Sequence, residues 1–230
     1  MSTGLHRRRS QPGLQAVLWD MDGLLVDTEP LWTVAETELA ARLGGTWSDE
    51  LKAEIVGTRL EVAVPTILRW YGVDASPTAV AESSAWLLSR MVELFAEDMR
   101  GLPGADALLA DLARAEVPVA LVSSSYRVLV DAVLRHGFGP FRVTVAGDEV
   151  RLGKPDPEPY LTACAALHVD PLRCVVMEDS LAGVQSGHAA GCAVVAVPSV
   201  VGVVVPPAPL RLVLTSLEGL DAATLSSLVA

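Results

Sequence analysis

Two aspartates, Asp20 and Asp22, stand one residue apart directly after the apolar run of residues 16–19. Catalytic and ligand-binding groups of open α/β sheets gather at the carboxyl ends of buried strands, which is where this pattern would place both carboxylates. An aspartate there can attack phosphorus or bind a hard cation. The same residue types are also common in turns, so this segment alone leaves both interpretations open.

Short apolar runs recur along the chain and alternate with segments of helical periodicity. The runs are rich in valine and leucine without strict alternation, which is typical of strands buried on both faces of a parallel sheet. They cover residues 16–19, 119–122, 174–177 and 193–197, and helices are expected at 105–115, 127–136, 158–167 and 181–190. This alternation predicts a doubly wound α/β core.

Residues 30–99 interrupt this alternation. They contain no convincing buried strand, and amphipathic helices are expected at 31–43, 60–71 and 78–96. A helical block of this size, inserted after the first strand, predicts a small second domain, with residues 1–29 and 100–230 forming the core. The breakers Gly101 and Pro103 mark the return to the core.

The composition limits the possible partners. The 230 residues are 51% hydrophobic with a formal net charge of −11, which argues against nucleic acid or an anionic membrane. No signal peptide is expected, and the longest apolar run, 193–205, is too short to span a bilayer. Three cysteines without metal-ligand spacing indicate free thiols in a reducing cytosol. We therefore expect a cytoplasmic monomer, with a disordered tail over residues 1–14 and a proline-rich loop over 198–209.

Three further segments carry hydroxyl, lysine and carboxylate groups. Residues 123–125 are serines that follow the run 119–122, and such serines either cap a helix or bind an anion. Lys154, one of only two lysines, is held between a glycine and a proline, which suits a fixed positive charge for a phosphate. Glu178 and Asp179 follow the run 174–177, where they either complement a helix dipole or bind a metal.

The combination is more specific than its parts. Three predicted strands end in acids or hydroxyls at one sheet edge, and the placed lysine joins them. Together these groups supply carboxylates for Mg²⁺, a nucleophile, and donors for a phosphate. Phosphoryl transfer depends mainly on such positioning and charge neutralisation.

These four segments resemble the four signature motifs of the haloacid dehalogenase superfamily, in order and in spacing. The helical insert resembles the α-helical cap of its phosphatase and phosphomutase branch, and the resemblance covers about residues 16–197. It implies a Rossmann-like core with an inserted cap. Within this branch, the chain is most similar to sugar-phosphate phosphatases of the hexitol or 2-deoxyglucose 6-phosphate type, through residues 20–32, 57–59 with 70–72, and 169–174.

The resemblance implies a role for each acid. Asp20 would be the nucleophile, and Asp22 the general acid–base that protonates the leaving alcohol and then activates water. Mg²⁺ would lie between Asp20 and Asp179, assisted by the backbone carbonyl of Asp22 and by Glu178. The expected reaction is Mg²⁺-dependent hydrolysis of a sugar or polyol phosphate through an aspartyl-phosphate.

The phosphate and substrate contacts follow in the same way. Ser123 and Lys154 would hold the transferring phosphoryl group, with Ser124 beside them. Glu29 and Arg59 are candidates for substrate contacts from the cap, although Arg59 also fits a surface helix. Trp19 replaces the phenylalanine usual in the family, a change that should not affect chemistry.

Other activities compete with this one. A β-phosphoglucomutase-like enzyme would carry a cap histidine twelve residues after the nucleophile, where this chain has Trp32. A phosphonatase would use a cap lysine, but Lys52 is the only candidate and is expected at an exposed helix start. A dehalogenase would not need Asp22. A non-catalytic member would lack one of the ionisable groups named above, and none is missing.

Overall fold

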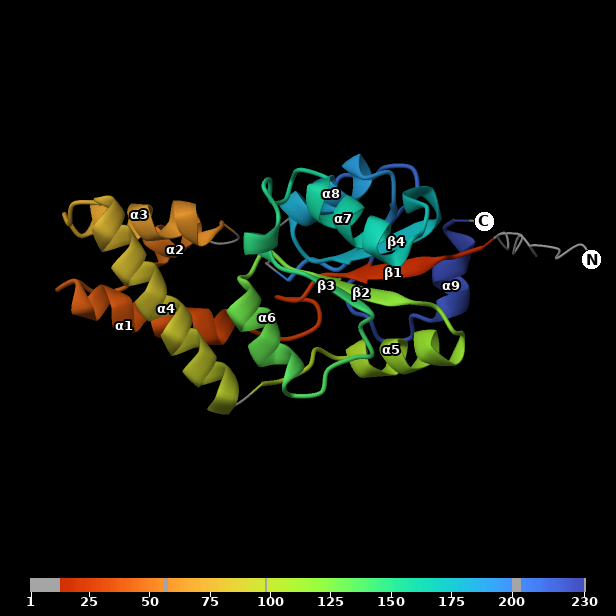
Figure 1. Ribbon diagram of the computed structural model, residues 1–230, viewed down its shortest axis with the longest axis horizontal. Coiled ribbons are helices and arrows are strands. Elements are labelled where there is room, and N and C mark those ends of the chain that lie inside the picture. Colours follow the sequence, from red (N-terminus) through yellow and green to blue (C-terminus); the bar gives the residue numbers. More distant parts are fainter. Residues whose placement is uncertain (1–12, 56–57, 98, 200–203, 230) are drawn as a thin grey trace, which may run out of the picture.

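A six-stranded parallel sheet forms the centre of the computed structural model, which describes residues 13–55, 58–97, 99–199 and 204–229 (Figure 1). The strand order is β3-β2-β1-β4-β5-β6, and every neighbouring pair is parallel. The strands are β1 (Ala16–Trp19), β2 (Val119–Val122), β3 (Val143–Val145), β4 (Cys174–Glu178), β5 (Ala193–Ala196) and β6 (Arg211–Val213). The doubly wound α/β prediction is confirmed, and β3 and β6 are additions at the two edges.

Helices cover both faces of the sheet, which explains why its central strands lack polar alternation. Val17 and Trp19 of β1 pack in one cluster with α5, α6 and α9, whereas Leu18 packs with α7 and α8 on the opposite face. These helices are α5 (Ala105–Arg114), α6 (Arg127–Leu134), α7 (Glu158–Leu167), α8 (Leu181–Ala189) and α9 (Ala222–Ser227), with short 3-10 turns η1 (Gly147–Glu149) and η2 (Pro171–Arg173). Each central strand is therefore apolar on both sides.

Four helices occupy the segment predicted as a second domain, residues 30–99, and we use the name cap for residues 29–97, from the start of the first helix to the end of the fourth. They are α1 (Glu29–Arg42), α2 (Asp49–Ile55), α3 (Leu60–Trp70) and α4 (Pro77–Glu97), and they lie beyond one end of the sheet in Figure 1. The two connections to the core run side by side, since Asp27 N donates to Arg100 O at 3.1 Å and Leu102 N to Leu25 O at 3.0 Å.

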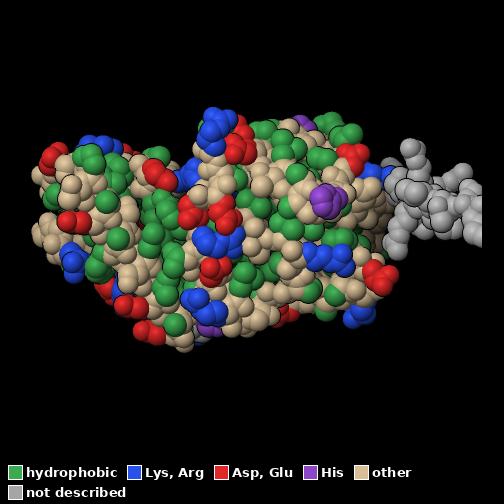
Figure 2. Space-filling view, in the orientation of Figure 1, with side chains coloured by type: hydrophobic (Ala, Val, Ile, Leu, Met, Phe, Trp, Pro, Cys, Tyr) green, Lys and Arg blue, Asp and Glu red, His purple; other side chains and the backbone are tan. Residues whose placement is uncertain are grey.

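The cap also contacts the core directly. Tyr126, just before α6, donates from its hydroxyl to Glu61 of α3 at 2.7 Å. His136 Nε2 lies 2.7 Å from the carbonyl oxygen of Phe95 at the end of α4. In Figure 2, acidic and basic side chains meet along this junction beside a band of hydrophobic ones.

Some sequence predictions lie outside the described residues. These are most of the tail at 1–14 and residues 200–203 of the proline-rich segment. Among the described residues, no helix is both long and apolar enough to cross a bilayer.

Trp19 provides a test of the core. Its side chain is fully buried, and its indole N–H has no hydrogen-bond partner among the described residues. Trp19→Phe removes that unsatisfied donor, which should stabilise the fold by about 1–3 kcal/mol. It also removes ring volume from the core, which should destabilise the fold by a similar amount. We expect its unfolding free energy to change by less than about 1.5 kcal/mol, against a loss of about 3–5 kcal/mol for Trp19→Ala. Denaturant unfolding measures both, and equal losses would contradict this packing.

Candidate active site

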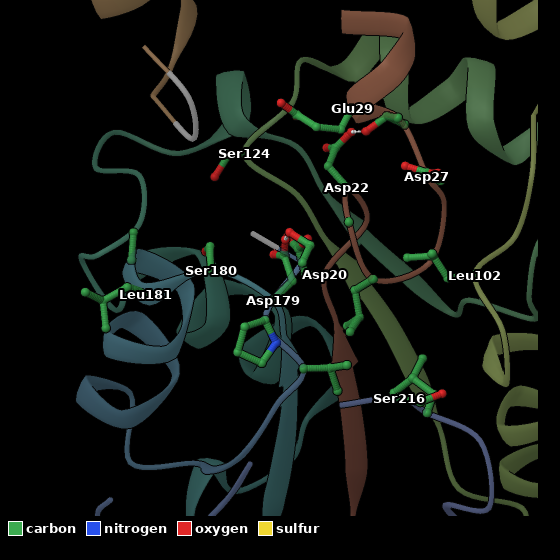
Figure 3. Close-up of a pocket in the computed structure, with 18 of the residues that line it drawn as sticks. Asp20, Asp22, Asp27, Glu29, Leu102, Ser124, Asp179, Ser180, Leu181 and Ser216 are labelled. Atoms are coloured by element: carbon green, nitrogen blue, oxygen red, sulfur yellow. Dashed lines mark hydrogen bonds between the residues drawn. The ribbon is translucent and has the colours of Figure 1, made fainter. Parts of the chain in front are cut away.

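The carboxyl ends of β1, β2 and β4 meet at one edge of the sheet and bring the predicted residues together. Asp20 follows β1, Ser123 follows β2, and Glu178 ends β4. Backbone hydrogen bonds continue the sheet past these ends, with Asp20 N donating to Met177 O at 3.0 Å and Ser123 N to Val145 O at 2.9 Å. Figure 3 shows Asp20 and Asp179 side by side at the centre of the site, with Asp22 and Glu29 above them.

Lys154 lies at the centre of the buried charge cluster. Its ammonium nitrogen is 2.5 Å from Asp20 Oδ1 and 2.6 Å from Glu178 Oε1, and it donates to the Val122 carbonyl at 2.9 Å. Burial favours the neutral amine, but the charges of Asp20 and Glu178 outweigh it and raise the pKa of Lys154 above its ordinary value. The residue is thus a fixed cation beside Asp20.

Glu178 is a fully engaged carboxylate. Its Oε1 accepts from Lys154 and from the Tyr160 hydroxyl at 2.7 Å. Its Oε2 accepts from the N–H groups of Asp179 and Ser180 at 3.0 and 3.1 Å, and from the Ser180 hydroxyl at 3.0 Å. Burial alone would raise the pKa of Glu178, but Lys154 and these donors lower it. This arrangement positions Lys154 and leaves Glu178 little capacity for a further ligand.

Helix α8 approaches Glu178 too closely for any residue except glycine. A Cβ atom built on Gly183 would lie 1.7 Å from Glu178 Oε1, which is a severe overlap. The glycine at the first turn of α8 therefore makes room for the buried carboxylate.

Three carboxylates gather at this edge, and the two that are less fully engaged, those of Asp20 and Asp179, fit a hard cation. One oxygen each of Asp20, Glu178 and Asp179 lie within 4.8 Å of one another, and hard oxygen donors are the ligands that Mg²⁺ prefers. Burial, together with the charge of Glu178, raises the pKa of Asp179 to about 7. Burial also raises the pKa of Asp20, which Lys154 only partly offsets. This excess of negative charge is the condition that a bound dication would relieve.

The Asp22 side chain lies outside that group and is held by hydroxyls. Thr28 donates to its Oδ1 at 2.7 Å, while Ser123 and Ser125 donate to its Oδ2 at 3.1 and 2.8 Å. Neither Thr28 nor Ser125 was individually predicted to contact Asp22. The run of three serines was a signal for Ser125, whereas the contact of Thr28 arises only from the fold of the segment that follows β1.

Two cavities meet above Asp22. The larger, about 660 Å³, is lined by Asp20, Lys154 and Asp179 among others. The smaller, about 150 Å³, lies between cap and core. Both are lined by Asp22, Glu29 and Ser124, so the expected substrate contacts Glu29 and Ser124 lie at their junction.

Arg59 and Lys52 line the smaller cavity. The Arg59 guanidinium donates to the carbonyl oxygen of Gly147 in the core, so it joins cap to core. The expectation that Lys52 is exposed is wrong. Its side chain is 29% exposed, because its ammonium lies 3.2 Å from Glu29 Oε1 and donates to Thr33 Oγ1 at 2.7 Å, both on α1.

Comparison with known proteins identifies the family. The model of the haloacid dehalogenase-like hydrolases matches residues 14–191, most of the chain and every site residue described above. The chain belongs to the haloacid dehalogenase-like hydrolase family. It is therefore an enzyme of the hydrolase class.

Several relatives in this family are similar over most of the chain. Hexitol phosphatase A of Escherichia coli (strain K12) is 37% identical over 186 residues, covering 78% of this chain and 81% of that protein. The solved structure of CbbY from Rhodobacter sphaeroides in complex with xylulose-(1,5)bisphosphate is 30% identical with a TM-score of 0.83, covering 93% of this chain and 99% of that one.

A third relative is longer. The bifunctional riboflavin kinase/FMN phosphatase of Arabidopsis thaliana is 36% identical over 189 residues, which cover 80% of this chain and 48% of that protein. This hydrolase chain therefore matches about half the length of that relative.

Removal of one partner of Lys154 tests the buried cluster. Glu178→Gln leaves the ammonium with Asp20 as its one remaining carboxylate, and we expect a loss of about 3 kcal/mol of unfolding free energy. The control Tyr160→Phe removes one hydrogen bond to Glu178 and should cost about 1.5 kcal/mol. Denaturant unfolding with chelator present measures both, and a smaller loss for Glu178→Gln than for Tyr160→Phe would refute this role.

Proposed function

We propose that the chain is a Mg²⁺-dependent phosphatase that hydrolyses a small phosphorylated metabolite through a phosphorylated Asp20. The observation that carries the proposal is the 2.5 Å contact between Lys154 and Asp20 at the floor of a large cavity. A carboxylate is a weak nucleophile toward a phosphate because the two repel each other. A fixed ammonium beside it neutralises part of that repulsion.

The residues divide the reaction into two steps. Asp20 attacks phosphorus, and the bond to the leaving oxygen breaks as Asp22 gives that oxygen a proton. Asp22, now ionised, then takes a proton from the water that attacks the phosphorylated Asp20 and releases inorganic phosphate. The hydroxyls of Thr28, Ser123 and Ser125 can both donate and accept, so they can accommodate Asp22 in either protonation state.

Charge on the phosphoryl oxygens is offset by the groups around them. We propose that Lys154 and the hydroxyls of Ser123 and Ser124 contact these oxygens. Mg²⁺ held by Asp20 and Asp179, with the Asp22 carbonyl, would supply further neutralisation when bound. Because Glu178 already accepts hydrogen bonds at both oxygens, we propose that it positions Lys154 and contributes to the metal only indirectly.

Hydrolysis is favoured over mutase chemistry by the position of Trp32. This residue occupies the place of the mutase histidine and lines the smaller cavity. His136, His168 and His188, the histidines of the described part, do not line either cavity. Among the described residues, therefore, no histidine lines the cavities around Asp20 to prepare transfer of a phosphoryl group to a second sugar hydroxyl.

The substrate class follows from the relatives and from the cap. Relatives named as hexitol phosphatases and the chemistry of the cavities support a sugar or polyol phosphate. The three cysteines are free thiols, which supports our proposal of a reducing, cytoplasmic location. We still expect the chain to act as a monomer and not to bind nucleic acid.

Phosphate release from a panel of sugar, polyol, glycerol and nucleoside phosphates, with Mg²⁺ or with chelator, tests the activity. Asp20→Asn should keep the fold and abolish release, because an amide cannot attack phosphorus. Asp22→Asn should lower kcat by about 10²–10⁴-fold, the usual worth of general acid–base catalysis. Equal release from Asp20→Asn and the parent, or metal-independent release, would overturn the proposal.

Binding of the metal can be measured without turnover. With Mg²⁺ at about 100 times its dissociation constant, the unfolding free energy of the parent should rise by about 2.7 kcal/mol. Asp179→Asn should lose most of this rise, whereas the control Asp106→Asn, on the exposed face of α5, should keep it. An undiminished rise in Asp179→Asn would remove Asp179 from the metal site.

A further inference from the structure

The smaller cavity contains an acid that the proposed mechanism does not use. Helix α1 places Glu29, Trp32 and Glu36 at successive turns of one face, and all three line this cavity. Lys52 of α2 lies opposite them. The face therefore runs from the catalytic Asp22 into the interior of the cap.

Glu36 is half-buried, and Lys52 is the cation that acts on its carboxylate. No described residue donates a hydrogen bond to it. Burial, with the charge of Glu29 added, raises the pKa of Glu36 to about 7, although Lys52 opposes this shift. Partial burial of a carboxylate to which no described residue donates has a free-energy cost. A ligand that donates hydrogen bonds to Glu36 would relieve that cost.

Both cations of the cavity have partners within the protein, although Arg59 Nε has none among the described residues. Lys52 is paired with Glu29 and Thr33, and Arg59 donates to the Gly147 carbonyl. A second anionic group on the substrate would thus meet the carboxylates of Glu29 and Glu36, while Lys52 already neutralises Glu29 and the Gly147 carbonyl holds one guanidinium nitrogen of Arg59. Hydroxyl groups, in contrast, can donate to a carboxylate and accept from an ammonium.

The remaining walls and the size restrict the ligand further. Apart from the charged groups, the walls are largely apolar, and Trp32 offers a flat ring for aliphatic C–H groups. The cavity of about 150 Å³ is much smaller than the neighbouring one of about 660 Å³, which limits the length of a leaving group that it can hold. This is room for a short hydroxylated carbon chain.

We propose that Glu36 is a specificity-determining residue that accepts hydrogen bonds from the hydroxyls of an uncharged polyol or sugar leaving group, and that it disfavours substrates with a second anionic group. This inference rests on the proposed phosphatase activity and deepens it. Lys52, fixed by Glu29 and Thr33, is the neighbouring donor to the same hydroxyls.

Two variants of Glu36 separate recognition from chemistry. Glu36→Met keeps the length of the side chain but can neither accept a hydrogen bond nor carry charge, whereas Glu36→Gln keeps an acceptor oxygen. The matched control is Glu54→Gln, which removes one negative charge from the exposed surface of α2. The substrates are hexitol and hexose monophosphates, xylulose-(1,5)bisphosphate, and an aryl phosphate whose leaving group has no aliphatic hydroxyl.

The expected readout is a change in substrate preference. For Glu36→Met, the ratio of kcat/KM on the best polyol monophosphate to that on the aryl phosphate should fall by about tenfold or more. Its preference for that monophosphate over the bisphosphate should also shrink. Glu36→Gln should fall between Glu36→Met and the parent, and Glu54→Gln should keep the parental ratios. The melting temperature of Glu36→Met should equal or exceed that of the parent, because a desolvated carboxylate is removed.

The outcomes separate the two proposals. If the parent releases phosphate but Glu36→Met changes activity on every substrate equally, or on none, the role of Glu36 is refuted and the phosphatase stands. If the parent releases no phosphate even from the aryl ester, the proposed function fails, and the inference about Glu36 fails with it.

Discussion

The buried ammonium of Lys154 holds together the edge of the sheet at which Asp20 and Glu178 meet. It contacts Asp20 after β1, the last carbonyl of β2, and Glu178 at the end of β4. Without this cation, two buried carboxylates would repel each other across a few ångströms in a medium that screens charge poorly. The geometry of three adjacent strand ends thus depends on one side chain, supplied by the loop before α7.

The surrounding residues hold that cation in place by fixing its partner Glu178. Tyr160 of α7 and the N–H groups at the start of α8 fix Glu178, and the glycine at position 183 lets α8 approach it. As a result, Oδ1 of Asp20 contacts Lys154, and the Asp20 side chain lines the larger cavity. Asp22, held by hydroxyls rather than by a cation, differs from Asp20 in environment, which suits it to proton transfer rather than attack.

Sequence reasoning recovered the features that local pattern encodes. The four central strands and the acids at their ends follow from apolar runs that stop at charged residues, and the fold places Asp20, Ser123 and Glu178 together as predicted. Strands β3 and β6 were missed because each has only three residues at a sheet edge, where the apolar signal is weak. Motif spacing identified Lys154, yet it gave no indication that Glu178 would hold the lysine.

The cap was less predictable for a physical reason. Helical periodicity reports which face of a helix is apolar, but it does not report which polar residues of different helices meet. The pairing of Lys52 with Glu29, and the absence of a described hydrogen-bond donor to Glu36, depend on where α2 is placed relative to α1. The substrate selection that we propose for such contacts is therefore encoded between segments rather than within one.

The central claim is that Asp20 becomes phosphorylated, and the stereochemistry at phosphorus tests it most directly. A chiral, isotopically labelled thiophosphate ester would be hydrolysed in isotopically labelled water and the configuration of the released thiophosphate determined. Attack by Asp20 followed by attack by water makes two in-line displacements, so the account predicts retention of configuration. Inversion would show a single displacement by water and would contradict a phosphorylated Asp20.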